Sequence, residues 1–84
     1  MNNKDILKKK ILYNSHHRGT KEMDILLGSF VKKYIDSFTN NELYELESLL
    51  KVDDDFLYRW YFNKDEISKI PKNSVSKKLK KFKL

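Results

Sequence analysis

Apolar residues recur at helical spacing along most of the chain, and no long stretch alternates strictly between apolar and polar positions. The longest such pattern covers residues 21–38, where apolar residues three and four positions apart form one stripe. Its members are Met23, Leu26, Leu27, Phe30, Val31, Tyr34 and Phe38. The pattern predicts an amphipathic helix over residues 21–38. Gly28 inside it would cost about 1 kcal/mol relative to Ala, so we expect it to mark a close contact with another helix.

Shorter helices are expected on either side of this one. Residues 4–13 carry Leu7 and Ile11 on one face and predict a first helix, and the polar residues 14–19 predict the connection that follows it. Thr39-Asn-Asn-Glu42 has the sequence of a capping box, in which the Thr hydroxyl and the Glu carboxylate accept hydrogen bonds from free amides. The helix that begins there is expected to bury four leucines, namely Leu43, Leu46, Leu49 and Leu50.

Two further helices are expected in the second half of the chain. The acidic residues 53–55 suit the N-cap and the positive end of a fourth helix. Its apolar face consists of Phe56, Leu57, Trp60 and Tyr61. Residues 72–84 form a basic helix or tail whose apolar residues are Val75, Leu79 and Phe82. The chain is therefore predicted to be all-α, a compact bundle of about five short helices in a single domain of residues 1–84.

Composition removes several classes of site. The 84 residues include no cysteine, which excludes a disulfide framework, a thiolate metal site and a cysteine nucleophile. Only two glycines and one proline are present, so a glycine-rich phosphate loop is not expected. No apolar run approaches the roughly 20 residues of a membrane span, so we expect no membrane insertion.

Charge is segregated along the chain. Residues 1–21 carry a net charge of +5 (six basic, one acidic), residues 22–68 a net of −6 (five basic, eleven acidic) and residues 69–84 a net of +7 (seven lysines). A protein that binds nucleic acid electrostatically usually places its basic residues on a face of the folded core. The acidic middle therefore argues against nucleic acid as a partner.

Neither of the two clusters that suggest metal binding or catalysis fits such a role. His16 and His17 are adjacent in a predicted connection, where their side chains point in different directions, so we expect them to be solvated or to face a partner. The acidic run 53–55 lacks the glycine and the alternating oxygen ligands of a calcium loop. No nucleophile with a base, no paired buried carboxylates and no metal cluster can be assembled, so no catalytic or metal-binding residue is expected and the chain is predicted not to be an enzyme.

The segment Arg18-Gly19-Thr20-Lys21-Glu22 is the strongest candidate for a binding site. Gly19 has no side chain at a point where a connection enters a long helix, so a partner's backbone could come close. Arg18 and Glu22 lie on its two sides and could make charge-assisted hydrogen bonds with that partner. The alternative is that Arg18 and Glu22 satisfy each other as an ordinary surface ion pair at a helix start. Spacing alone leaves both open.

The surrounding residues resemble a known family. The pattern Tyr13-x-Ser15-x-x-Arg18-Gly19-x-x-Glu22-x-Asp24-x-Leu26-Leu27-x-x-Phe30 is similar to the signature of the succinate dehydrogenase flavinylation factors, called assembly factor two in mitochondria. Downstream, Thr39-x-x-Glu42 and Asp54-x-Phe56-x-Tyr58-x-Trp60 resemble the family's later segments. The resemblance covers residues 11–62, and the chain after Trp60 departs from the family pattern.

This resemblance implies an all-α assembly factor that is not an enzyme. It implies that the chain binds the flavoprotein subunit of succinate dehydrogenase, and in some lineages of fumarate reductase, and promotes covalent attachment of FAD to it. The FAD would belong to the partner, so no cofactor is expected on this chain itself. The implied partner-binding residues are Arg18, Gly19, Glu22 and Asp24, to which we add the neighbouring His16 and His17. The free chain is expected to be a monomer.

Two questions of function and location remain at this point. Because the chain is too short to hold both the domain and a mitochondrial presequence, we expect a bacterial cytoplasmic protein. The alternative function is that of a small basic helical protein that binds nucleic acid or acts in regulation, based on the pI near 9.5 and the lysine-rich ends. A third interpretation is a peripheral membrane role for the basic terminal helix.

Overall fold

The described part of the chain consists of helices joined by turns and loops. A computed structural model describes residues 3–84, so the first two residues of the predicted domain lie outside the described part. Within that range five helices and no strand are formed. They are α1 (Asn3–His16), α2 (Lys21–Tyr34), α3 (Asn40–Leu50), α4 (Asp54–Tyr61) and α5 (Ser74–Lys81). The all-α fold class and the number of helices are therefore confirmed.

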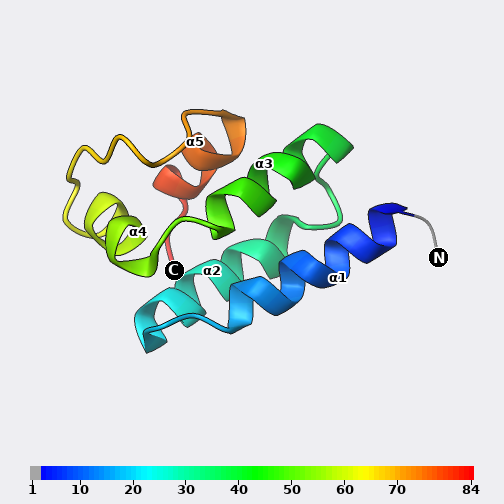
Figure 1. The fold of residues 1–84 in the computed structure, drawn as a ribbon, viewed down its shortest axis with the longest axis horizontal. Coiled ribbons are helices and arrows are strands. Elements are labelled where there is room, and N and C mark those ends of the chain that lie inside the picture. Colours follow the sequence, from blue (N-terminus) through cyan, green and yellow to red (C-terminus); the bar gives the residue numbers. More distant parts are fainter. Residues whose placement is uncertain (1–2) are drawn as a thin grey trace.

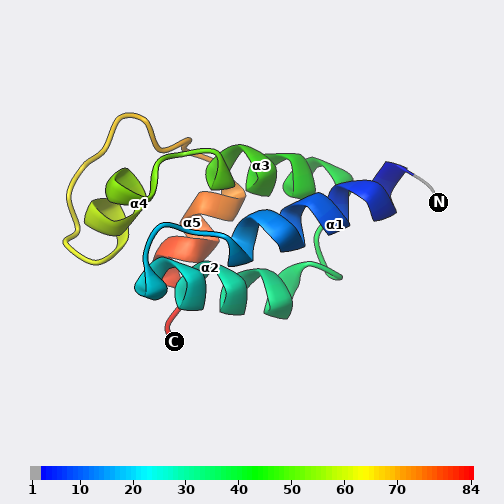
Figure 2. The same ribbon diagram turned by 60° about the horizontal axis from the view of Figure 1, so that its bottom comes forward.

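Three helices form the body of the molecule, which measures 39 × 24 × 20 Å. Helices α1 and α2 lie side by side and antiparallel, and α3 packs against α1 (Figures 1 and 2). Helix α5 packs against α3, and α4 lies at the end of the molecule where the α1–α2 connection also lies (Figures 1 and 2). Helices α4 and α5 thus pack on the same core as the first three helices.

The predicted stripe of α2 is the centre of that core. Six of its seven apolar residues are buried, and the seventh, Tyr34, is half-buried. The four predicted leucines of α3 are buried, as is Leu57 of α4. The ring of Phe82 packs edge-on against Phe30, at 5.4 Å between ring centroids, so the basic end of the chain is part of the fold.

Two helix boundaries differ from the prediction. Helix α1 continues to His16, three residues beyond the expected end. Ser15 can be buried in this additional turn because its hydroxyl donates to the Leu12 carbonyl at 2.8 Å and therefore does not require a hydrogen bond to water. Helix α2 ends at Tyr34, four residues early. There the amide and hydroxyl of Ser37 both donate to the Tyr34 carbonyl at 2.9 Å, forming a turn in place of another helical turn.

The helix caps were predicted with mixed success. The capping box of Thr39 and Glu42 is confirmed, with both hydrogen bonds formed. Asp53 occupies the N-cap of α4 as predicted, but its side chain makes no capping hydrogen bond. The second aspartate of the run, Asp54, instead contacts the α1–α2 connection, which a local reading of the sequence could not show.

Gly28 lies where α1 and α2 touch, as predicted. A Cβ atom on it would lie 2.8 Å from Cε1 of His16, which is exposed and can rotate away. We therefore expect Gly28→Ala to raise the free energy of unfolding in urea, by up to about 1 kcal/mol, because alanine is the better helix former. The double variant His16→Ala/Gly28→Ala is the control. If Gly28→Ala lowered the stability and the added His16→Ala substitution restored it, the imidazole ring of His16 would instead be fixed against Gly28.

Candidate partner-binding site

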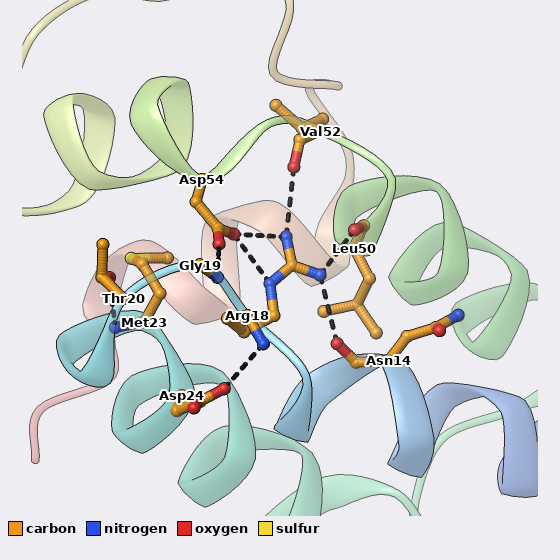
Figure 3. A network of polar contacts seen from close by, with 9 residues as sticks. All are labelled: Asn14, Arg18, Gly19, Thr20, Met23, Asp24, Leu50, Val52 and Asp54. Atoms are coloured by element: carbon orange, nitrogen blue, oxygen red, sulfur yellow. Dashed lines mark hydrogen bonds and ion pairs between the residues drawn. The ribbon is translucent and has the colours of Figure 1, made fainter.

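Arg18 is the centre of a polar network that joins α1, α2, α3 and α4 (Figure 3). Its side chain is only 9% exposed, and its guanidinium forms an ion pair with Asp54, with Nη2 and Nε at 2.6 and 2.7 Å from Oδ1. The remaining N–H groups donate to the carbonyl oxygens of Asn14 at 3.2 Å, Leu50 at 2.8 Å and Val52 at 3.2 Å. A nearly buried guanidinium is thereby fully supplied with acceptors, which is the condition for keeping it charged.

The same network holds the backbone of the α1–α2 connection. The Arg18 amide donates to Oδ1 of Asp24 at 2.8 Å, and the Gly19 amide donates to Oδ2 of Asp54 (Figure 3). Thr20 then caps α2, its hydroxyl accepting from the Met23 amide at 3.2 Å. We call Arg18, Asp24 and Asp54, with the backbone that they hold, the loop clamp. Carboxylates from two helices hold two consecutive residues of the connection, Arg18 and Gly19, and the cap at Thr20 holds the next, so we infer that the connection is a rigid surface.

The loop clamp changes the roles expected for Arg18 and Glu22. Arg18 directs its charge into the molecule, toward Asp54 of α4, and the alternative surface ion pair between Arg18 and Glu22 is not formed. Glu22 is exposed on the first turn of α2. The predicted pair of opposite charges beside Gly19 is therefore reduced to one free charge, the carboxylate of Glu22.

Gly19 has an intramolecular reason to be glycine. A Cβ atom at this position would lie 3.1 Å from Oδ2 of Asp54, whose other carboxylate oxygen is held by Arg18. Because that carboxylate is fixed, it cannot move aside cheaply. The opposite face of Gly19 is exposed.

The two histidines lie next to this surface. His16 ends α1 against Gly28, and His17 begins the connection. The His17 ring stacks on that of Tyr13 at 3.8 Å between centroids, and its Nδ1 lies 2.7 Å from the Tyr13 carbonyl oxygen, to which it must donate. Tyr13 is 62% exposed.

Two residues of this region were not predicted as site residues. Asp54 was assigned to a helix cap, and its ion pair with Arg18 spans 36 positions, which no local pattern reveals. Tyr13 enters the sequence analysis only as part of the family signature, because the helix is expected to end there, and a pair with a side chain four positions later is expected only inside a helix.

Neither a metal centre nor a membrane span is found in residues 3–84. They contain no group of three or more His, Asp or Glu side chains placed to hold a metal ion. None of the described helices is both long and apolar enough to cross a lipid bilayer.

Comparison with known proteins gives one consistent family. The family model described as "Flavinator of succinate dehydrogenase" matches residues 9–83. Similar proteins include "Succinate dehydrogenase assembly factor 2, mitochondrial" of Scheffersomyces stipitis, 36% identical over 80% of this chain and 45% of that protein. The protein of the same name from Dictyostelium discoideum is 39% identical over 73% of this chain and 43% of its own length. The "FAD assembly factor SdhE" of Acetobacter pasteurianus is 37% identical over 68% of this chain and 52% of that protein.

The extent of these matches is limited in two ways. The chain spans about half the length of the curated relatives that it matches. No solved structure gives a significant match.

The expectation of a bacterial cytoplasmic protein is contradicted. Most of the similar proteins are named mitochondrial assembly factors, although a bacterial relative is also present. The expectation rested on chain length, and length carries no such conclusion when the chain corresponds to only about half of each relative.

Proposed function

We propose that this chain, which belongs to the succinate dehydrogenase flavinator family, binds the flavoprotein subunit of succinate dehydrogenase and promotes covalent attachment of FAD to it. The observation that carries the proposal is the family match over residues 9–83, a range that includes the whole loop clamp. The flavoprotein subunit of fumarate reductase is a second client under the same proposal, and the free chain acts as a monomer.

The proposed contact surface is the exposed side of the α1–α2 connection. His16, His17, Gly19 and Glu22 are exposed there, whereas Arg18 and Asp24 are half-buried within the loop clamp. The exposed residues touch the partner, with Gly19 allowing close approach and the Glu22 carboxylate accepting charge-assisted hydrogen bonds. Arg18 and Asp24 act as positioning residues, because their side chains are used within the chain.

The chain does this without chemistry of its own. Covalent flavinylation joins a histidine of the partner to the flavin, and both reactants belong to the partner. A rigid surface that binds one arrangement of the partner more tightly than another increases the population of that arrangement. When the favoured arrangement holds the histidine against the flavin, the reaction gains from proximity and orientation. The loop clamp supplies the rigidity that such selection needs.

Glu22→Ala is expected to reduce covalent flavin on the partner subunit about tenfold under limiting amounts of this protein, while leaving its folding unchanged. The reason is the loss of a charge-assisted hydrogen bond to the partner, a change of about 1.5 kcal/mol. The measurement is in-gel flavin fluorescence of the denatured flavoprotein subunit, expressed alone, with wild-type protein or with the variant. Asp36→Ala is the control, since the Asp36 side chain is 90% exposed, lies in the turn after the far end of α2 and, among residues 3–84, forms an ion pair only with Nζ of Lys8, at 3.1 Å.

Each result of this comparison has a definite meaning. Equal flavin with wild type and Glu22→Ala would remove Glu22 from the site. Equal flavin with and without the protein would refute the proposed function. An equal loss with Asp36→Ala would point to general electrostatics in place of a local contact.

A further inference from the structure

A groove lies between α4 and α5, at the end of the molecule that also carries the α1–α2 connection, but none of its lining residues belongs to the proposed contact surface. Its walls are formed by side chains of the last turn of α4, of the segment that connects α4 to α5, and of one side of α5. It has a volume of about 610 Å³, within the range of small-molecule sites. Trp60, Ile67 and Pro71 form apolar parts of the wall. The groove can therefore take the apolar body of a ligand as well as a charged group.

Four lysines line this groove, two from the segment that connects α4 to α5 and two from α5, namely Lys64, Lys72, Lys77 and Lys80. None of the four forms an ion pair with a carboxylate of residues 3–84. Two carboxylates also line the groove: Asp65 is held by Nε of Arg59 at 3.3 Å, and Glu66 is exposed to solvent. The groove thus has four ammonium groups against two carboxylates, one of which is already paired with Arg59, and so carries an excess of positive charge.

Lys80 is built into the wall. Its ammonium donates to the Trp60 carbonyl at 2.6 Å and lies 4.5 Å from the centre of the Trp60 ring. Burial lowers the pKa of Lys80, and the nearby charge of Lys64 lowers it further, while Asp65 partly opposes this. An ammonium held between a carbonyl and an aromatic face, and repelled by another lysine, is stabilised by an incoming anion.

The backbone at Lys64 gives an independent indication. Lys64 has φ = 64°, the left-handed region, and no other non-glycine residue among the described ones has a positive φ. After a helix this conformation is usually given to glycine or asparagine, because a side chain costs about 1–2 kcal/mol there. Lys64 therefore combines a backbone conformation that is costly for a residue with a side chain and a place in the lining of the groove.

We propose that the groove between α4 and α5 binds a small phosphate-bearing organic anion of about nucleotide size. The lysines would contact the phosphates as point charges, and the walls formed by Ile67 and Pro71 would contact the apolar part. This inference does not rest on the proposed function, because the groove shares no residue with the α1–α2 connection.

The only tryptophan of the chain lies in this wall and reports binding directly. Titration with ADP is expected to change Trp60 fluorescence in a saturable way, pyrophosphate to bind more weakly, and adenosine to have no effect at the same concentrations. The affinity for ADP should fall as salt is raised. No saturable change with ADP, or an equal response to adenosine, would overturn the proposal.

Lys64→Asn separates this site from diffuse electrostatics. Asparagine tolerates the left-handed region, so the variant should be at least as stable to urea as the wild type, while its affinity for ADP falls about fivefold to tenfold. Lys78→Gln removes the same charge from the other side of α5, where Lys78 lies over the Tyr34 ring, and should leave the affinity within twofold. Equal losses in the two variants would overturn the proposal. So would displacement of ADP by a polyglutamate peptide or by anionic vesicles at lower concentration, which would assign the surface to a macromolecule.

Discussion

Replacing Asp54 with alanine is expected to lower the free energy of unfolding by about 3 kcal/mol, a large part of the stability of a domain this small. The substitution leaves the Arg18 guanidinium nearly buried without its counter-charge, and it removes the acceptor of the Gly19 amide. Asp54 is itself 18% exposed, which places the expected loss at the lower end of the range for breaking a buried ion pair. Urea denaturation followed by circular dichroism measures it.

The neighbouring aspartate provides the control for this change. Asp55 is exposed in the first turn of α4 and contributes only to the helix dipole, so Asp55→Ala should cost no more than about 0.5 kcal/mol. A double variant, Arg18→Met/Asp54→Leu, removes both charges and should be more stable than Asp54→Ala alone. If Asp54→Ala and Asp55→Ala were equally stable, the loop clamp would not hold the fold together.

Local features of the fold could be predicted from the sequence because they depend on nearby residues. The stripe of α2 needs only the helical period, and the capping box of Thr39 needs two side chains three positions apart. The end of α2 could not be found in this way, since Phe38 continues the apolar period after the helix has ended. Phe38 is buried from the turn instead, with its ring stacked on Tyr34 at 5.8 Å. Periodicity identifies burial more reliably than it identifies a helix end.

The candidate site could likewise be predicted only in part. Its position could be predicted, because a glycine between charged residues at a helix start is visible in the sequence. The direction of each charge could not, because Arg18 finds its acceptors on α3 and α4, more than 30 positions away. Arg18, which the sequence predicts to contact a partner, is therefore part of the loop clamp. The role of Asp54 could not be predicted for the same reason, because it depends on the packing of α4 against the α1–α2 connection, which is far away in the sequence.

Gly19→Arg is expected to lower covalent flavin on the partner subunit to the level seen without this protein, a loss of at least about 100-fold. The Cβ atom of an arginine here would lie 3.1 Å from Oδ2 of Asp54, so the long cationic side chain must displace the loop clamp that supports the proposed contact surface. The partner also loses the glycine surface that it approaches. In-gel flavin fluorescence measures the loss, with Lys21→Arg as the control for a bulky exposed cation two positions away. A folded Gly19→Arg protein that still supported normal flavinylation would exclude this loop from the interface.

Gly19→Ala distinguishes the two reasons for a glycine at this position. The added methyl group meets Asp54 at 3.1 Å, so the variant should lose about 1 kcal/mol of stability in urea, and should lose less when Asp54 is already alanine. One methyl is too small to hold a partner away, so flavinylation by folded Gly19→Ala protein should stay within about threefold of wild type. Loss of flavinylation without loss of stability would instead make partner approach the only reason for the glycine. If stability and flavinylation fell in proportion, the glycine would be required only by the loop clamp. The contact surface would then fail only because the loop clamp that holds it is disrupted.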